Sequence, residues 1–128
     1  MTDAELNELT GRIIGCTFKV LNGLGTGFIE EVYHNALVHE LTKAGLVART
    51  KDPIKVFYDG VEVGKFIPDI LVNSMIIIEL KATKSHEDSF TAQCLNYLKA
   101  TGKPLCLLLN FGNSQLDIKR YRGPRVSP

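Results

Sequence analysis

The chain has 128 residues, of which 45% are hydrophobic and 23% are charged, and its formal net charge is +1 at pH 7. These values are typical of a soluble globular domain and exclude a strongly basic protein, so any attraction to a polyanion must come from a local basic surface or from an oligomer. We expect one domain over residues 1–122, followed by a basic tail at residues 123–128.

The three cysteines, Cys16, Cys94 and Cys106, are widely spaced and form no CxxC pair. This favours buried free thiols in a reducing compartment over disulfides or a zinc site. No stretch approaches the roughly 18 apolar residues of a membrane span, and the acidic N-terminal segment does not resemble a signal peptide. We therefore expect a cytoplasmic location and no contact with membranes.

A first helix is predicted over residues 4–21, where apolar residues recur with mostly helical spacing. Gly23, Gly25 and Gly27 then interrupt the pattern. A GxGxG run resembles a phosphate-binding loop, but such loops normally follow a strand. We therefore interpret the glycines as the end of one helix and the start of the next, with Thr26 as the N-cap.

The second predicted helix spans residues 27–43 and ends near Gly45. Its expected apolar face is formed by Ile29, Val32, Tyr33, Ala36, Leu37 and Leu41. Glu30 falls inside this sector, which leaves two interpretations: a partner of the helix dipole, or a carboxylate aimed inward at the sheet. His34 lies at the edge of the sector, where a histidine is more often a boundary residue than a ligand.

Extended segments follow at residues 47–50, 53–58 and 61–67. Asp59-Gly60 between the last two is a strong signal of a two-residue hairpin turn. We expect one face of this hairpin to carry Ile54, Val56, Tyr58, Val61 and Val63, and the whole hairpin to serve as scaffold.

Residues 68–81 place three charged side chains in two apolar runs. Asp69 stands in the first run, while Glu79 and Lys81 close the second, where isoleucines at 76–78 indicate a strand buried on both faces. Burying an unpaired carboxylate is costly, so Asp69 and Glu79 must be paired, neutralised or bound to a cation. Because side chains alternate along a strand, Glu79 and Lys81 share one face.

The length of the turn decides whether Asp69 lies beside Glu79. A two-residue turn at residues 73–74 would place Asp69 opposite Ile78, with the carboxylates on opposite faces of the sheet. A three-residue turn at residues 73–75 pairs Asp69 with Glu79 and puts both beside Lys81. We predict the three-residue turn. Two carboxylates about 4 Å apart repel by roughly 4 kcal/mol at an effective dielectric near 20, a repulsion that Lys81 would offset in part and a divalent cation more fully.

A third helix is predicted from about residue 85 to residue 100, with Gly102 as its stop. Its expected inward residues are Phe90, Cys94, Tyr97, Leu98 and Thr101. Gln93 and Tyr97 stand one turn apart and can project over the same patch. By periodicity alone, Tyr97 is a core aromatic and Gln93 a rim residue.

Two last strands are expected at residues 105–109 and 116–121, followed by a basic run of Lys119, Arg120, Arg122 and Arg125. Such a run is more often a solvated terminus than a polyanion contact. The order of elements predicts an α/β or α+β fold, in which helices cover both faces of a mixed β-sheet that includes an antiparallel hairpin.

Four motifs follow one another over roughly residues 6–122. They are Gly27-Phe28-Ile29-Glu30-Glu31-Val32-Tyr33, then Pro68-Asp69 with Glu79-Leu80-Lys81, then Gln93-Cys94-Leu95-Asn96-Tyr97-Leu98, and Leu108-Leu109-Asn110-Phe111-Gly112. The second resembles the signature of the PD-(D/E)XK, or restriction-endonuclease-like, superfamily. The others are similar to the GxxExxY, QxxxYL and LLNFG motifs of its GxxExxY branch.

The resemblance implies a core of a helix, three antiparallel strands, a helix and a further strand. It implies that Asp69 and Glu79 bind Mg²⁺ or Mn²⁺, that Glu30 is an additional metal or water ligand, and that Lys81 positions or activates the attacking water. The candidate substrate contacts are Gln93, Tyr97 and Lys84. One position departs from the family pattern, because Phe90 stands where relatives are expected to carry a histidine; His86, one turn earlier, is the nearest replacement.

These observations lead to the hypothesis of a metal-dependent phosphodiesterase that acts on nucleic acid, with DNA as the expected substrate. A nuclease-fold module that binds nucleic acid or a protein partner without cutting is the alternative, and the near-neutral charge favours it. A third interpretation is a structural domain whose buried charges form an ion-pair network. A homodimer would supply a second cutting site and a larger basic surface, although no motif demonstrates one.

Overall fold

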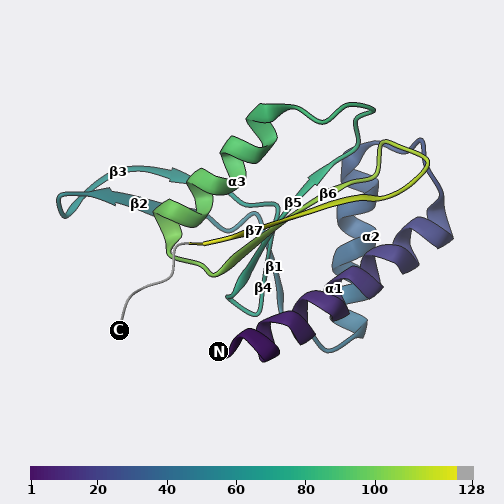
Figure 1. Ribbon diagram of the computed structural model, residues 1–128, viewed down its shortest axis with the longest axis horizontal. Coiled ribbons are helices and arrows are strands. Elements are labelled where there is room, and N and C mark those ends of the chain that lie inside the picture. Colours follow the sequence, from purple (N-terminus) through teal and green to yellow (C-terminus); the bar gives the residue numbers. More distant parts are fainter. Residues whose placement is uncertain (124–128) are drawn as a thin grey trace.

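A computed structural model describes residues 1–123 of the chain. The helices and strands of this part are α1 (Asp3–Leu24), α2 (Glu30–Lys43), β1 (Ala48–Thr50), β2 (Ile54–Tyr58), β3 (Val61–Phe66), β4 (Ile70–Val72), β5 (Ile76–Lys81), α3 (Asp88–Thr101), β6 (Leu105–Asn110) and β7 (Asp117–Arg122). Within these residues the strands form a sheet in the order β1-β4-β5-β6-β7 and a separate hairpin of β2 and β3 (Figure 1).

The five-stranded sheet of residues 1–123 contains both parallel and antiparallel strand pairs, as the predicted mixed sheet requires. β1, β4 and β5 run antiparallel to one another. The chain then crosses through α3 to β6, which runs parallel to β5, and β7 closes the sheet antiparallel to β6. The parallel pair brings the carboxyl ends of β5 and β6 together, so Lys81 lies beside Asn110.

Helices cover both faces of the sheet, as the sequence predicts (Figure 1). Alternation along β5 places Ile76, Ile78 and Leu80 in the larger core beneath α1 and α2. Ile77 faces the other way, into a smaller core where α3 contributes Cys94 and Leu98. The catalytic candidates on β5 therefore stand at the boundary between two packed layers.

The start of α1 is set by a local capping box, whereas the start of α2 has no side-chain cap and depends on tertiary contacts. Thr2 and Glu5 form a capping box at the start of α1, which runs on through Gly23 to Leu24, three residues beyond the predicted end. The prediction of Thr26 as the N-cap of the second helix is wrong, because α2 begins at Glu30 with Ile29 as its cap residue and no side-chain cap.

Tyr33 explains the late start of α2. Its hydroxyl donates to the carbonyl of Gly25 at 2.7 Å and accepts from the N–H of Phe28 at 3.3 Å. Its ring stacks on that of Phe111, with centroids 4.4 Å apart. The buried tyrosine thus holds the glycine-rich connection as a loop, and Ile29 is exposed rather than part of the apolar face. The third helix also begins later than predicted, at Asp88, with Glu87 as its cap residue.

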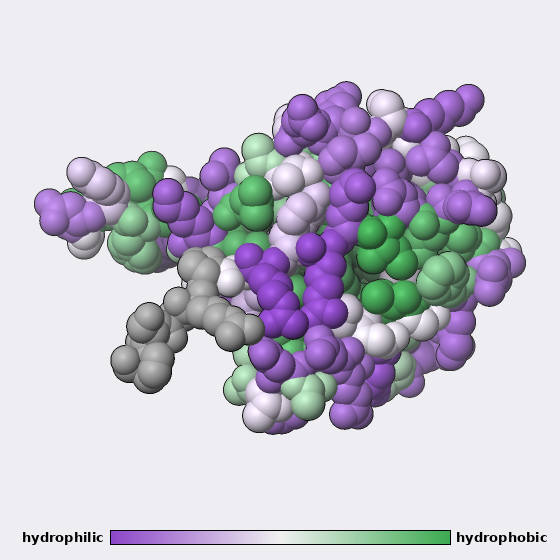
Figure 2. Space-filling model, in the orientation of Figure 1, coloured by the Kyte–Doolittle hydropathy of each residue, from purple (hydrophilic) through white to green (hydrophobic). Residues whose placement is uncertain are grey.

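The β2–β3 hairpin projects from the body of the molecule (Figure 1). Asp59 and Gly60 both adopt positive φ, 53° and 76°, as a two-residue hairpin turn requires. The register shifts between Val56 and Phe57, where the pairing skips Val63, while Tyr58 still pairs with Val61 as the predicted common face requires. Exposed apolar side chains cover the hairpin behind its hydrophilic tip, as Figure 2 shows. They are Phe57, Tyr58, Val61 and Val63.

All three cysteines are buried free thiols, which confirms that prediction. In residues 1–123, no helix is both long and apolar enough to cross a membrane. Arg125, the last residue of the predicted basic run, lies outside the described residues.

Candidate active site

The turn between β4 and β5 has the predicted three-residue length. Ile70 pairs with Ile78 and Val72 with Ile76, so the register places Asp69 opposite Glu79. Asn73 and Ser74 both adopt left-handed backbone conformations, with φ of 51° and 59°. The side-chain oxygen of Asn73 also accepts from the N–H of Val47 at 2.8 Å. The turn is thereby fixed, and the two candidate carboxylates share one edge of the sheet.

Backbone hydrogen bonds hold both carboxylates in place. The N–H of Leu80 donates to Oδ2 of Asp69 at 2.8 Å, and the N–H of Asp69 donates to Oε1 of Glu79 at 3.3 Å. Each carboxylate is therefore bound by the backbone of the strand that carries the other. These backbone hydrogen bonds hold the two carboxylates close together, and neither carboxylate belongs to an ion pair within residues 1–123.

Glu79 carries the largest electrostatic cost of the site. Only 3% of its surface is exposed. Burial, and then the charge of Asp69, raises the pKa of Glu79 to about 9. The hydrogen bond from the N–H of Asp69 acts in the opposite direction and lowers this pKa. A protonated Glu79 can also hydrogen-bond to the Asp69 carboxylate. Without a cation, the pair therefore holds a proton between two groups that would otherwise repel.

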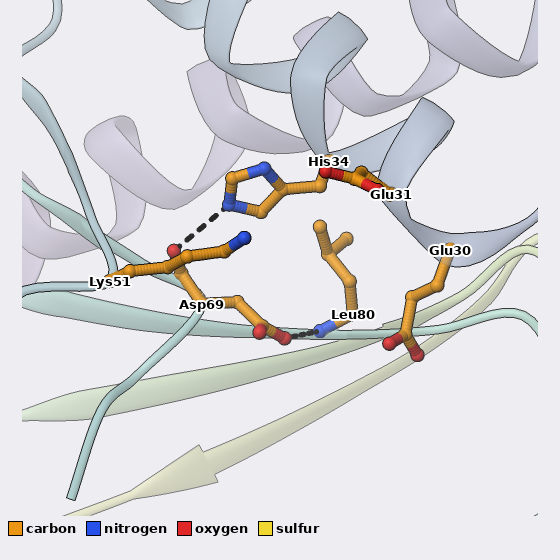
Figure 3. A pocket seen from close by; sticks show the side chains of 6 residues that line it. All are labelled: Glu30, Glu31, His34, Lys51, Asp69 and Leu80. Atoms are coloured by element: carbon orange, nitrogen blue, oxygen red, sulfur yellow. Dashed lines mark hydrogen bonds between the residues drawn. The ribbon is translucent and has the colours of Figure 1, made fainter.

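Glu30 approaches this pair from the first turn of α2. It lines a cavity of about 190 Å³ together with Glu31, His34, Lys51, Asp69 and Leu80 (Figure 3). Burial and the charge of Asp69 raise the pKa of Glu30, while Lys81 and His34 act in the opposite direction. The inward orientation inferred from helical periodicity agrees with this position, although the residue as a whole remains exposed.

His34, which helical periodicity places at the edge of the apolar sector, contacts Asp69 directly. The side chain is 8% exposed, and Nε2 donates to the backbone carbonyl of Asp69 at 3.0 Å. The same carbonyl accepts from the N–H of Lys51 at 3.3 Å. Sequence reasoning missed Lys51 altogether, since it follows a short strand and belongs to no periodic pattern.

Lys81 lies on the other side of β5, facing α3. Its Nζ stands 4.6 Å from the centre of the Phe90 ring, a cation–π contact. Phe90, which stands where relatives are expected to carry a histidine, therefore contacts the ammonium group of Lys81. Lys81 lines a second cavity of about 500 Å³, whose other walls come from α3. They are Ser89, Phe90, Ala92, Gln93, Asn96 and Tyr97.

Gln93 and Tyr97 meet in this second cavity. Nε2 of Gln93 donates to the hydroxyl of Tyr97 at 2.6 Å. Burial and the charge of Glu79 raise the pKa of Tyr97, so its hydroxyl keeps its proton at neutral pH. The Tyr97 ring stacks on Phe66 at the end of β3, with centroids 4.1 Å apart. The hairpin is thus fastened to α3 at the wall of the site.

Two further candidates lie beside the site rather than in it. Lys84 is exposed in the connection between β5 and α3 and lines neither of the two cavities. His86 is also exposed; its Nε2 lies 3.0 Å from Oγ1 of Thr91, and its ring meets Phe90 edge to face. His86 therefore supports the residue that contacts Lys81.

A family model described as the PD-(D/E)XK nuclease superfamily matches residues 7–121. The chain belongs to the PD-(D/E)XK nuclease superfamily. The fold is similar to that of an alkaline exonuclease from Laribacter hongkongensis, with a TM-score of 0.54 and 14% sequence identity over 97% of this chain and 73% of that one. No curated protein sequence matches the chain.

Nucleases of the PD-(D/E)XK superfamily generally use divalent metal ions. In residues 1–123, no group of three or more histidine, cysteine, aspartate or glutamate side chains is gathered closely enough to hold an ion. The donor set nevertheless suits Mg²⁺ or Mn²⁺, which prefer carboxylate oxygens and retain several waters. Asp69 and Glu79 lie together where a cation would relieve their repulsion, and Glu30 lines the same cavity as Asp69.

Proposed function

We propose that this protein is a metal-dependent nuclease of the GxxExxY branch, with residues 1–122 as its domain, and that it hydrolyses phosphodiester bonds in DNA. The observation that carries the proposal is the pairing of Asp69 with Glu79 at the end of a buried strand that also bears Lys81. A buried carboxylate pair costs stability unless a cation or proton compensates it. The three buried free thiols support a reducing, cytoplasmic setting.

In this proposal, Asp69 and Glu79 hold Mg²⁺ or Mn²⁺ and Glu30 serves as an additional metal or water ligand. When bound, the cation supplies acidity to a coordinated water and neutralises charge on the phosphoryl oxygens. The raised pKa of Glu79 supports the assignment, because one proton now occupies a place that a divalent ion would fill more effectively. His34 keeps Asp69 in position through its carbonyl.

Lys81 supplies a positive charge where water meets the scissile phosphorus. Water forms the new P–O bond and gives up a proton to solvent, while the bond to the leaving oxygen breaks and that oxygen takes up a proton. The ammonium group of Lys81 stabilises the charge that gathers on the phosphoryl oxygens. Phe90 holds the ammonium group in position without neutralising it. The hydroxyl of Tyr97, oriented by Gln93, can donate to a phosphate oxygen, while Lys84 offers charge from outside the cavity.

The test of this function is the replacement of Lys81 by alanine. We expect Lys81→Ala to lower the rate of DNA cleavage in Mg²⁺ or Mn²⁺ by about 10²-fold or more, the usual effect of removing one charge-stabilising group. Lys19→Ala, which removes an exposed lysine of α1, is the matched control and should leave the rate unchanged. Circular dichroism and thermal unfolding verify that both variants fold.

Cleavage by Lys81→Ala at the unaltered rate would exclude the proposed role of Lys81. Salt-dependent DNA binding by the unaltered protein, without cleavage in either metal, would instead identify the alternative function, a nuclease-fold module that binds without cutting. The near-neutral net charge of +1 is the observation that favours this alternative.

A further inference from the structure

Lys51 adopts an unusual backbone conformation at the edge of the first cavity. Its φ is 53°, in the left-handed region that residues other than glycine rarely occupy. The conformation is held by the hydrogen bond from its N–H to the carbonyl of Asp69. Strain of this kind persists only where the surrounding structure imposes it, and it is concentrated at functional sites.

The side chain of Lys51 points into the cavity beside the ring of His34 (Figure 3). Glu30, Glu31 and Asp69 line the same cavity, yet Lys51 belongs to none of the ion pairs within residues 1–123. A lysine whose role was to neutralise these carboxylates would lie against one of them. Its ammonium group is instead held near the carboxylates and available to an anion.

The two cavities lie on opposite sides of β5. Leu80 lines the first and Lys81 the second, and consecutive strand residues point to opposite faces of a sheet. Asp69 also lines the first cavity, close to its partner Glu79. A strand of nucleic acid whose scissile phosphate sits at the carboxylate pair reaches Lys51 when it continues across Asp69 into the first cavity.

We propose that Lys51 binds the phosphate adjacent to the scissile one, so that the preferred substrate carries at least two phosphates. This inference rests on the proposed function, because the carboxylate pair defines where the scissile phosphate lies. A lysine binds phosphate as a point charge with several donors, and a second phosphate would give Lys51 the ion-pair partner that it does not have within residues 1–123. Lys51 thus selects oligonucleotides over simple phosphodiesters.

The experiment compares Lys51→Met with the unaltered protein on two substrates in Mn²⁺: a thymidine dinucleotide with one phosphodiester and a trinucleotide with two. We expect Lys51→Met to lower kcat/KM for the trinucleotide about tenfold, the usual effect of losing a charged hydrogen bond, and to leave the dinucleotide unaffected. Equal loss on both substrates, or no loss on either, would overturn the proposal.

A binding measurement keeps the test independent of turnover. Affinity for a fluorescent thymidine oligonucleotide is measured in Ca²⁺ as a function of salt. Lys51→Met should weaken binding and reduce the slope of log K against log salt by about 0.7, as expected when one contact to a single strand is lost. An unchanged slope and affinity would contradict the role of Lys51. If the unaltered protein binds but does not cleave, the proposed catalysis fails while this readout still decides the role of Lys51.

Two variants serve as controls. Lys51→Gly removes the same ammonium group and suits the positive φ, so it should fold at least as stably as the unaltered protein and still lose the phosphate contact. Lys19→Met removes an exposed lysine of α1 and should change neither readout. Restored binding in Lys51→Gly would show that the methionine variant had disturbed the fold, and it would also contradict the proposal.

Discussion

At the scale of single residues, Glu79 is where burial and function oppose each other most directly. The side chain lies near the carboxyl end of β5, the middle strand of the five-stranded sheet. It is hydrogen-bonded to the N–H of Asp69 and almost wholly removed from water. Natural cores rarely bury such a group without compensation. The carboxylate is therefore a source of instability in the metal-free protein and, under the proposed function, a preorganised metal ligand.

The raised pKa of Glu79 predicts how stability depends on pH. Between the ordinary value of 4.5 and the folded value of about 9, the folded protein binds one more proton at this site than the unfolded chain does. Stability contributed by that proton is complete below pH 4.5 and is lost as pH rises toward 9, by at most about 1.4 kcal/mol per pH unit. Glu79→Gln has no such proton to lose.

Urea denaturation in EDTA checks this expectation. The free energy of unfolding of Glu79→Gln should approach that of the unaltered protein near pH 4.5 and exceed it increasingly toward pH 9. A difference that stays constant over this range would mean that Glu79 titrates normally. Addition of Mn²⁺ should stabilise only the unaltered protein, because the glutamine lacks the charge that binds the ion.

The residues that sequence patterns missed share a physical cause. Periodicity identifies the face of a helix on which His34 lies, but not the backbone carbonyl of Asp69, 35 positions later, that it contacts. Lys51 precedes Asp69 by 18 positions and owes its placement to a positive φ that its residue type disfavours. Contacts made by backbone atoms across the sheet leave no signature in residue types.

At the scale of elements, the turn between β4 and β5 sets the chemistry of the site. One residue fewer in the turn would shift the pairing and turn Asp69 to the face opposite Glu79. Asn73 secures the turn twice, since its N–H donates to the carbonyl of Val47 and its side chain accepts from the N–H of that residue. The register thus depends on one side chain outside the site.

Replacement of Asn73 tests the contribution of this turn. Asn73→Ala should lower the free energy of unfolding by about 1–2 kcal/mol, because it loses a hydrogen bond and keeps a positive φ that alanine disfavours. Asn73→Gly loses the same hydrogen bond without the conformational cost and should be the more stable of the two. Urea denaturation of both variants measures the difference, and equal stabilities would contradict a role for the left-handed conformation.

Strands and registers were more predictable than helix starts. The pairing of Asp69 with Glu79 was predicted from a three-residue turn that places both carboxylates beside Lys81, and the structure confirms the register. The start of α2 did not follow from local signals, because the hydroxyl of Tyr33 competes for the backbone groups that a helix at Gly27 would use. The bulge in the β2–β3 hairpin likewise has no marker in the alternating pattern.

At the scale of the whole molecule, the site lies where the two packed layers meet. Helix α2 holds Asp69 through His34, while α3 presents Gln93 and Tyr97 at the wall of the second cavity. The β2–β3 hairpin leads along the chain into Asp69 and is fastened to α3 by the stacking of Phe66 on Tyr97. Each layer therefore positions part of the candidate site.

The most direct test of this account is Mn²⁺ binding measured by electron paramagnetic resonance, which requires no choice of substrate. The unaltered protein should bind Mn²⁺, and Asp69→Asn and Glu79→Gln should each abolish binding, because both carboxylates serve the same ion. Lys19→Ala should bind as the unaltered protein does. Unchanged binding in both carboxylate variants, or no binding by the unaltered protein at millimolar Mn²⁺ with an oligonucleotide present, would contradict a metal site at Asp69 and Glu79.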